Sequence, residues 1–334
     1  TGAAYDELID EFITAARAVF PGVVIQFEDF ANHNAFRLLS KYRDRICVFN
    51  DDIQGTASVA LAGIFSALRV TGGNLRDQKL LFLGAGEAAT GIADLVASAM
   101  VAQGLSAEQA RQRCWLVDSR GLVVKSRTDL AEHKLPYAHD HAGIGNFLAA
   151  VKTLKPTALI GVAAVGGTFT QEVVEEMTRI NERPIIFALS NPTSQAECDA
   201  EQAYRWSSGR ALFACGSPFD PVTLNGKTFV PRQGNNSYIF PGMGLGAITS
   251  GARHITDDMF MTAAHTLAHL VTESDLEQGS LYPALPRIRE VSAHIATAVA
   301  DTAYKSGLAG KSRPQDVLAD VRSQMYDPHY KSYV

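Results

Sequence analysis

Hydrophobic positions along this chain follow two alternating patterns. Short apolar runs, typical of buried strands, occupy residues 23–27, 47–49, 79–83, 114–117, 158–161 and 185–189. Elsewhere apolar residues recur every three or four positions, which predicts helices over 5–20, 34–42, 56–70, 87–103, 170–180, 200–207, 255–272 and 288–306. The last stretch, 312–334, is polar and aromatic, and we expect it to form a tail packed on the rest of the chain.

The alternation of strands and helices predicts an α/β fold. Strands that are separated by helices usually pair in parallel, and helices then cover both faces of the sheet. From about Pro241 the pattern becomes helical, with helices over 255–272 and 288–306. We therefore expect a parallel sheet that is followed by a helical C-terminal part.

Composition and charge exclude several classes of protein. The 334 residues are 46% hydrophobic and 19% charged, which allows a large core and excludes a disordered chain. The net charge of −5 argues against nucleic acid or an anionic membrane as a partner. No apolar run approaches the length of a membrane span, about 18–20 residues, and the four cysteines form no close pair. These features fit a reducing, cytoplasmic compartment.

A glycine-rich turn follows the third apolar run. Gly84, Gly86 and Ala89 match the pattern G-x-G-x-x-A, with a strand before it and a helix after it. Gly84 permits a tight turn, Gly86 lets the backbone approach a pyrophosphate, and Ala89 lets the helix pack on the strand. The helix N-terminus at Glu87 and Ala88 favours the bound anion. The segment therefore predicts a dinucleotide site of the Rossmann type.

The next apolar run ends at Asp118, where an acid would bind the adenine ribose. Asp118 alone favours the free 2′-hydroxyl of NAD, whereas cations beside it favour the 2′-phosphate of NADP. Ser119 and Arg120 follow at once, and Lys134 lies farther along the chain. Because Arg120 and Lys134 fit an ordinary solvated surface equally well, the residues alone leave NAD and NADP open.

Four carboxylates form a second candidate site. Glu28 and Asp29 follow one short apolar run, and Asp51 and Asp52 follow the next. Converging carboxylates repel one another unless protons or a cation lie between them, and an all-oxygen set suits Mg²⁺ or Mn²⁺. Neighbouring residues of a regular strand point to opposite faces, so Glu28 and Asp29 share a metal only where the strand ends or bends. Helix N-capping by Asp29 and Asp52 is the alternative, and spacing alone does not decide between the two.

Several segments, in order along the chain, resemble the signature segments of malic enzymes. They are 27–36 (FEDFANHNAF), 49–56 (FNDDIQGT), 84–91 (GAGEAATG), 189–193 (LSNPT), 216–219 (GSPF) and 234–242 (GNNSYIFPG). The resemblance implies oxidative decarboxylation of (S)-malate to pyruvate and CO₂ with reduction of NAD or NADP. It also implies a Rossmann-type sheet domain, residues 51–239, inserted between segments 1–50 and 240–334 of a mainly helical catalytic domain.

The resemblance assigns roles to the four acids. Glu28, Asp29 and Asp52 match the acids that bind the divalent metal in malic enzymes. Asp51 matches a neighbouring acid that helps the catalytic base. Metal binding is therefore favoured over capping, with Mg²⁺ or Mn²⁺ as the cation.

The resemblance also assigns the polar groups at the cofactor. Asn191 and Asn236 match amides that contact the substrate and the nicotinamide end, and Asn235 is included beside them at the cofactor. Lys134 occupies a position that is characteristically Lys in members that use NADP. With Ser119 after the ribose-binding acid, this favours NADP, although NAD stays possible.

The chain departs from the family pattern in its proton-transfer residues. These are a Tyr in a Tyr-Thr-Pro-like motif and a Lys after a Gly-rich stretch, and neither segment has a match here. The chain begins at Thr1 without Met, and we expect it to be the C-terminal part of a malic enzyme. Lys41 and Tyr42 we expect to be structural or on the surface, and Arg232, where the family has a small residue, to lie near the cofactor or on the surface. Alone, the chain should turn over little malate, because acid–base groups contribute about 10²–10⁴-fold.

Two other functions compete with this interpretation. A non-decarboxylating 2-hydroxy-acid dehydrogenase needs a His–Asp pair and no metal, and neither His33 nor His139 has an obvious partner. A non-catalytic NADP-binding module would bind the cofactor without turnover. For the full-length enzyme we expect a homo-oligomer, a dimer or tetramer, in the cytoplasm or in an organelle.

Overall fold

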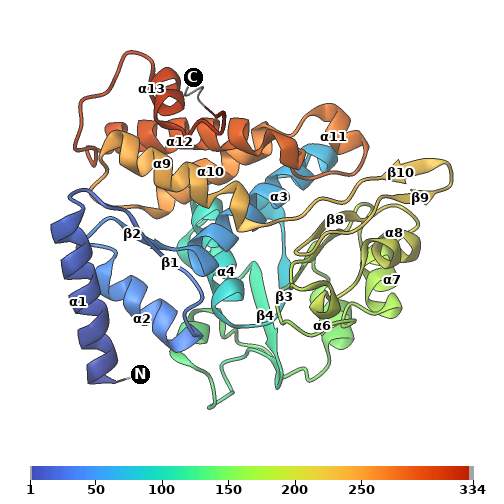
Figure 1. Cartoon of the computed structure of the whole chain (residues 1–334). Coiled ribbons are helices and arrows are strands. Elements are labelled where there is room, and N and C mark those ends of the chain that lie inside the picture. The colour runs from blue at the N-terminus through green and yellow to red at the C-terminus, as the bar shows by residue number, and fades with distance from the viewer. Residues whose placement is uncertain (1, 331–334) are drawn as a thin grey trace.

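The computed structural model describes residues 2–330 of the chain. Two helices and a small parallel sheet form its N-terminal end. The elements are α1 (Ala3–Val19), β1 (Ile25–Phe27), α2 (Asn32–Tyr42) and β2 (Val48–Asn50), drawn in blue in Figure 1. Ile25 pairs with Val48, and Phe27 pairs with Asn50. Because the two strands are parallel, the segments that follow them leave the sheet at the same edge. Residues 28–29 and 51–52 are thereby brought together.

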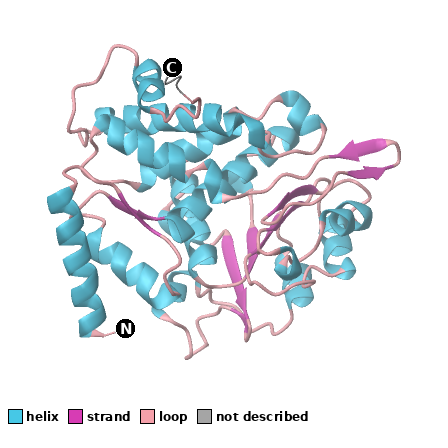
Figure 2. Cartoon of the chain, viewed as in Figure 1, coloured by secondary structure: helices cyan, strands magenta, loops and turns pink. Residues whose placement is uncertain are grey.

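A six-stranded sheet forms the centre of the fold (Figure 2). Its order is β5-β4-β3-β6-β7-β8, and β5 is antiparallel to β4 while the other neighbours are parallel. The strands are β3 (Leu80–Leu83), β4 (Cys114–Asp118), β5 (Gly121–Leu122), β6 (Ala158–Gly161), β7 (Ile185–Ala188) and β8 (Leu212–Cys215). The strand order reverses between β3 and β6, and ligands of such sheets bind at the carboxyl ends of the strands there.

Helices cover both faces of this sheet, which confirms the predicted α/β class. Leu80 and Phe82 of β3 join the core under α3 and α4, whereas Leu81 joins the core under α6, α7 and α8. The bounds of these helices are α3 (Thr56–Thr71), α4 (Glu87–Ala102), α6 (Phe147–Leu154), α7 (Gln171–Ile180) and α8 (Ala200–Trp206). Apolar residues at successive strand positions are explained by this burial on both sides.

Five further helices follow in the described part of the chain (Figure 1). They are α9 (Phe240–Ser250), α10 (Asp257–His269), α11 (Glu273–Glu277), α12 (Ile288–Lys305) and α13 (Val317–Gln324). Of these, α10 packs against α3, and α12 packs against α9, α10 and α13. A Cβ on Gly242 would lie 2.7 Å from Cβ of Ile295, so α9 and α12 approach closely only with glycine there. The ring of Phe260 on α10 lies 5.9 Å from that of Phe49, which joins this helical part to the N-terminal segment.

The hydrophobic pattern did not predict the shorter elements. They include α5 (Ala107–Arg111), the hairpin of β9 (Val222–Leu224) and β10 (Lys227–Phe229), a π turn η1 (Asp51–Gly55), and the 3₁₀ turns η2 (Leu75–Asp77), η3 (Glu132–Tyr137), η4 (Thr193–Gln195), η5 (Asn236–Tyr238) and η6 (Leu285–Arg287). It also omitted β5, β8, α6, α9 and α13. Most of these elements span too little of a strand or helix period to stand out in the sequence.

The prediction of a packed C-terminal tail is only partly right. Val317 and Val321 of α13 are buried against α12. Beyond the helix, however, Tyr326 is 80% exposed, and Tyr330 is also exposed. Residues 331–334, which the same prediction included, lie outside the described part of the chain.

One described stretch, Asp51–Thr71, is long and apolar enough to cross a membrane, with a mean hydropathy of 1.3. This corrects the expectation that no run approaches that length. The stretch is 78% buried inside the protein, and the core helix of a globular protein meets the same criterion.

Candidate metal and nucleotide site

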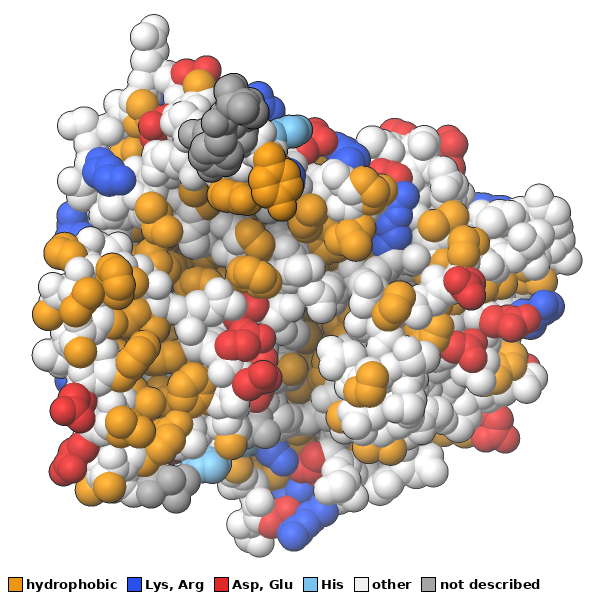
Figure 3. Space-filling view, in the orientation of Figure 1, with side chains coloured by type: hydrophobic (Ala, Val, Ile, Leu, Met, Phe, Trp, Pro, Cys, Tyr) orange, Lys and Arg blue, Asp and Glu red, His pale blue; other side chains and the backbone are white. Residues whose placement is uncertain are grey.

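Three carboxylates converge where β1 and β2 end. Oxygen atoms of Glu28, Asp29 and Asp52 lie within 4.8 Å of one another. Asp29 has a φ of 57°, so the chain bends sharply after β1 and its side chain joins that of Glu28. The backbone N–H of Asp29 donates to Oδ2 of Asp52 at 2.9 Å and holds the two segments together. Acidic side chains gather near the middle of the face in Figure 3.

Helix capping does not explain these acids. The residue that precedes α2 is Ala31, which makes no side-chain cap. At the π turn η1 the cap is Asn50, whose side chain accepts the N–H of Ile53 at 2.8 Å. Asp29 and Asp52 are therefore left with their carboxylates toward the cluster, and the capping alternative is wrong.

The electrostatics of the cluster favour a cation. Burial raises the pKa of Glu28, and the charges of Asp52 and Asp29 raise it further. Burial also raises the pKa of Asp52, which the hydrogen bond from Asp29 partly offsets. Within the described residues, no Lys, Arg or His side chain offsets the raised pKa of Glu28 or of Asp52. An all-oxygen set of this kind fits a hard divalent cation.

Asp51 lies behind this cluster and is almost completely buried. Its Oδ2 accepts a hydrogen bond from Nδ2 of Asn236 at 2.6 Å, which joins η1 to η5. Burial, followed by the charges of Glu28 and Asp52, raises the pKa of Asp51 to about 8. A Cβ on Gly55 would lie 1.9 Å from Oδ1 of Asp51, so the turn needs glycine there to admit the carboxylate.

The predicted glycine turn forms the floor of a groove at the carboxyl ends of β3 and β6. Gly84 has a φ of 118°, and a Cβ there would lie 2.7 Å from the carbonyl oxygen of Val162. Gly86 precedes α4 directly, so the first amides of that helix face the groove. The groove has a volume of about 700 Å³. Of the predicted residues it is lined by Gly84, Gly86, Glu87, Ala88, Asp118, Ser119 and Lys134.

The start of α4 also approaches the acid cluster. Burial, followed by the charge of Asp52, raises the pKa of Glu87 to about 7. Farther along α4, a Cβ on Gly91 would lie 2.8 Å from the carbonyl oxygen of Ile53, so the helix packs directly on η1. The groove and the carboxylate cluster are therefore neighbours, joined through the first turns of α4.

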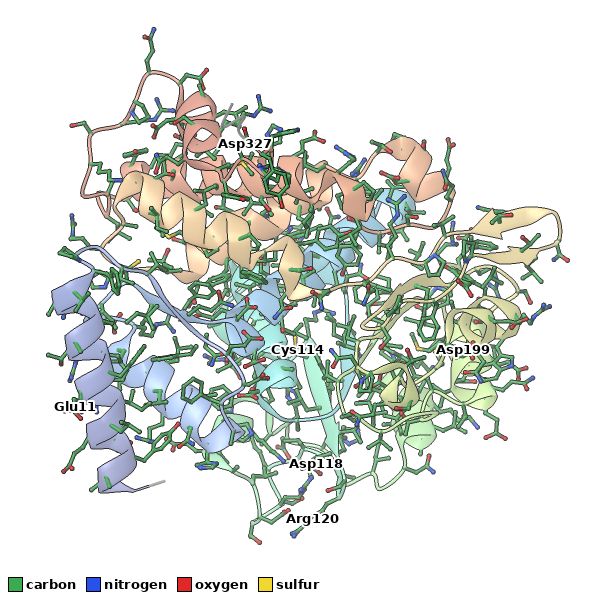
Figure 4. All side chains as sticks on the ribbon, viewed as in Figure 1. Glu11, Cys114, Asp118, Arg120, Asp199 and Asp327 are labelled. Carbon is green, nitrogen blue, oxygen red and sulfur yellow. The ribbon has the colours of Figure 1, made fainter. Side chains whose placement is uncertain are left out.

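Asp118 is engaged by three neighbours. Arg127 donates to both of its oxygens, at 2.8 and 3.1 Å, and Nζ of Lys134 donates to Oδ2 at 2.8 Å. The backbone N–H of Arg120 donates to Oδ1 at 2.9 Å. Burial opposes ionisation, but these hydrogen bonds outweigh it and lower the pKa of Asp118 to about 2. The side chain of Arg120 pairs with Asp129 at 3.0 Å and lies farther out, at the lower edge of Figure 4.

Sequence reasoning missed two residues at this groove. Arg127, the strongest partner of Asp118, stands between the two cations that were singled out, and the further cations Lys125 and Arg127 in the same connection were the available signal. His133 lines the groove, and its Nε2 lies 3.1 Å from the carbonyl oxygen of Ala85. Its ring also stacks on Phe36, a contact that spacing along the chain does not reveal.

Other predicted residues lie apart from the groove lining. Ala89 lies in the first turn of α4 and is buried against the sheet core. Asn191 follows β7 and is exposed, and Asn235 accepts the N–H of Ser237 at 3.0 Å. Arg232 does not lie on the open surface, because its Nη1 pairs with Asp275 at 2.8 Å in a mostly buried contact. The surface alternative is therefore wrong, and a place near the cofactor stays a prediction.

Lys41 and Tyr42 are structural, as predicted. Nζ of Lys41 lies 2.7 Å from Oδ2 of Asp10, and the hydroxyl of Tyr42 donates to the other oxygen. These contacts tie α2 to α1. His139 is likewise packed, with Nε2 2.8 Å from the carbonyl oxygen of Cys114. Among the side chains that the structure describes, the one His–Asp ion pair, His329–Asp327, is exposed near the C-terminus.

Family models match nearly the whole chain. Residues 53–304 match "Malic enzyme, NAD binding domain", and residues 1–43 match "Malic enzyme, N-terminal domain". The chain belongs to the malic enzyme family. Solved malic enzymes share its fold: that of Entamoeba histolytica superposes with a TM-score of 0.76 at 25% identity, over 95% of this chain and 62% of that one. The malic enzyme of Pyrococcus horikoshii gives 0.71 at 29% identity, over 94% and 69%.

Curated malic enzymes that use NADP are similar over the full chain. The NADP-dependent malic enzyme of Anas platyrhynchos is 54% identical over 336 residues, which cover 100% of this chain and 60% of that protein. The enzyme of Rattus norvegicus is 55% identical, over 98% and 58%. The chloroplastic enzyme of Flaveria trinervia is 55% identical, over 99% and 52%. The chain thus spans between half and two thirds of the length of these relatives.

Proposed function

We propose that this chain supplies the metal- and cofactor-binding part of an NADP-dependent malic enzyme. The reaction is the oxidative decarboxylation of (S)-malate to pyruvate and CO₂ with reduction of NADP. The observation that carries the proposal is the adjacency of the carboxylate cluster and the nucleotide groove, which the first turns of α4 join. The names of the NADP-dependent relatives at 54–55% identity support the same assignment.

The donor set fits a divalent cation. Glu28, Asp29 and Asp52 would hold Mg²⁺ or Mn²⁺, because their oxygens converge within 4.8 Å. Burial together with like charge opposes the ionisation of Glu28 and Asp52. When bound, such a cation supplies a Lewis acid for the hydroxyl and carboxylate oxygens of a 2-hydroxy acid.

Other residues of this chain position the substrate and hold protons. Asp51 lies beside the proposed metal ligands, and its carboxyl group would assist a base supplied from outside this chain. Asn236, whose Nδ2 donates to Asp51, holds that carboxyl group in place. Asn191 and Asn235 contribute polar groups near the nicotinamide end, at the carboxyl edge of the sheet.

We assign the cofactor as NADP from the state of Asp118. Its oxygens are already taken by Arg127 and Lys134, so Asp118 is a poor acceptor for the 2′-hydroxyl of NAD. Lys134 and Ser119 line the groove beside it and would receive the 2′-phosphate, with Arg120 farther out. The backbone at Gly84–Gly86 and the amides that open α4 would bind the pyrophosphate.

We propose that the 334 residues alone catalyse little turnover. They contain no match to the family segments with the proton-transferring Tyr and Lys, and Lys41 and Tyr42 are held by Asp10. In the division that we propose, 51–239 binds the nucleotide, while 1–50 and 240–334 belong to the catalytic domain. The complete enzyme would be a homo-oligomer of the cytoplasm or, as in the chloroplastic relative, of an organelle.

Binding and turnover experiments test this proposal separately. Calorimetric titration of the purified chain should show NADP binding that is tighter than NAD binding, and Mn²⁺ binding that is lost in Asp52→Asn. With saturating malate, NADP and Mn²⁺, turnover should fall short of the full-length enzyme by at least about 10²-fold, and EDTA should abolish what remains. Binding of neither nucleotide would refute the assignment, and full activity would refute the proposed lack of acid–base groups.

A further inference from the structure

A buried carboxylate lies between the loops that follow β6 and β7. Glu197 is 0% exposed, and its partners are a hydroxyl and backbone N–H groups rather than cations. Burial raises the pKa of Glu197, and hydrogen bonds from Ser190 and from backbone amides oppose that rise. Burying a carboxylate away from water costs free energy unless its oxygens accept hydrogen bonds. The hydrogen bonds from Ser190 and Ala163 therefore stabilise Glu197 in this buried position.

The contacts of Glu197 form a short chain of hydrogen bonds. The hydroxyl of Ser190 donates to Oε1 of Glu197 at 2.5 Å, and the N–H of Ala163 donates to the same oxygen at 3.2 Å. The hydroxyl oxygen of Ser190 in turn accepts the N–H of Ala164 at 2.9 Å. A Cβ on Gly161 would lie 2.4 Å from Cδ of Glu197, so the end of β6 admits the carboxylate only with glycine.

This chain of contacts ends at the wall of the nucleotide groove. Ala163 and Ala164 both line the groove. Ala164 has a φ of 53°, a left-handed conformation that is unfavourable for an L-residue and that the hydrogen bond to Ser190 helps to hold. Ser190 also immediately precedes Asn191. The Glu197–Ser190 pair therefore links one wall of the groove to the asparagine on the next loop.

The position of this wall indicates which half of a dinucleotide it serves. A sheet of this kind consists of two mononucleotide-binding halves, and the half with β3 and β4 carries Asp118, the ribose-binding position of the adenosine side. The loops after β6 and β7 belong to the other half. A bound dinucleotide would place its nicotinamide side against them.

We propose that Glu197 and Ser190 are positioning residues for the nicotinamide half of the cofactor. They hold the backbone at Ala163 and Ala164 and orient the loop that carries Asn191, without touching the adenosine half. This inference rests on the proposed binding of NADP by the groove.

Ser190→Ala tests the inference with little change in volume. We would measure dissociation constants for NADP and for adenosine 2′,5′-bisphosphate, which represents the adenosine half alone. Loss of the buried hydroxyl leaves the N–H of Ala164 unpaired, and we expect NADP affinity to fall about five- to tenfold. Affinity for the bisphosphate should stay within about twofold. Ser190→Thr keeps the hydroxyl and should restore most of the NADP affinity.

A matched control separates positioning from general destabilisation. Ser207 is also a buried serine, and its hydroxyl accepts the N–H of Ala211 at 3.0 Å at the end of α8, outside the groove lining. Ser207→Ala should lower the thermal midpoint but change neither dissociation constant. Glu197→Gln, which keeps one acceptor oxygen, should weaken NADP about two- to threefold.

Four results would overturn the inference. Ser190→Ala could weaken both ligands equally, or neither, and Ser207→Ala could reproduce its effect. If the unaltered chain binds the bisphosphate but not NADP, the inference fails while an adenosine site remains. If it binds neither ligand, the proposed function itself has failed.

Discussion

Replacing Lys134 with Gln should move the cofactor preference of this chain from NADP toward NAD. Nζ of Lys134 lies 2.8 Å from Oδ2 of Asp118, and the two side chains are 20% and 11% exposed. Glutamine keeps a polar side chain, one atom shorter, but removes the charge that would face a 2′-phosphate. A hydrogen bond to a charged group contributes about 1.5–3 kcal/mol, and the open groove favours the lower value, which is about a tenfold loss of NADP affinity.

NAD affinity should change by less than about threefold. Asp118 stays engaged because both nitrogens of Arg127 still donate to it, at 2.8 and 3.1 Å. Calorimetric titrations with NADP and NAD at two salt concentrations measure both affinities, and higher salt should shrink the NADP effect. Lys125→Gln, an exposed lysine on the same connection, is the matched control. Equal changes in both affinities, or none, would refute a role of Lys134 in recognising the 2′-phosphate.

Three further changes test other contacts of the site. Arg127→Leu should lower the free energy of unfolding in urea by about 1–3 kcal/mol at pH 7. Because the pKa of Asp118 is lowered to about 2, that stabilisation exists above the unfolded pKa and fades as the pH falls toward 2, so the difference between the proteins should vanish in acid. Gly91→Val forces a side chain against the carbonyl oxygen of Ile53, 2.8 Å from the new Cβ. The change should lower the free energy of unfolding by about 1–3 kcal/mol in a thermal unfolding experiment and should weaken Mn²⁺ binding. Unchanged Mn²⁺ affinity would contradict the coupling of α4 to η1. Burial and neighbouring charge raise the pKa of Asp51 to about 8, so without metal its contribution to stability declines as the pH rises toward 8. The rise in thermal midpoint that Mn²⁺ causes should therefore be larger at pH 8 than at pH 6. A rise that is the same at both pH values would contradict this.

Local chemistry made the architecture and part of the site predictable. Apolar runs must be buried on both faces of a parallel sheet, so the alternation of strands and helices was readable from the residues. The glycine turn was predictable because Gly84 is required by its positive φ and its close approach to Val162. Both features depend on neighbours within a few positions or on general rules of packing.

The choice between metal binding and capping depended on backbone geometry that spacing does not encode. Asp29 adopts a left-handed conformation that brings it beside Glu28, and Asn50 takes the cap that Asp52 could have made. Either outcome satisfies the same spacing of acids along the chain. The bend after β1 and the cap made by Asn50 distinguish them.

By itself, the sequence determined the class of fold, the family and the types of group at the site. The tertiary structure alone decided which of those groups meet. Arg127 closes on Asp118, and Glu197 reaches Ser190 under the neighbouring loop. Gly91 lets α4 rest on Ile53 and so joins the groove to the acids. The physical reason is that hydrogen bonds, close approaches and the resulting pKa shifts depend on distances across the fold, which a pattern along the chain does not contain.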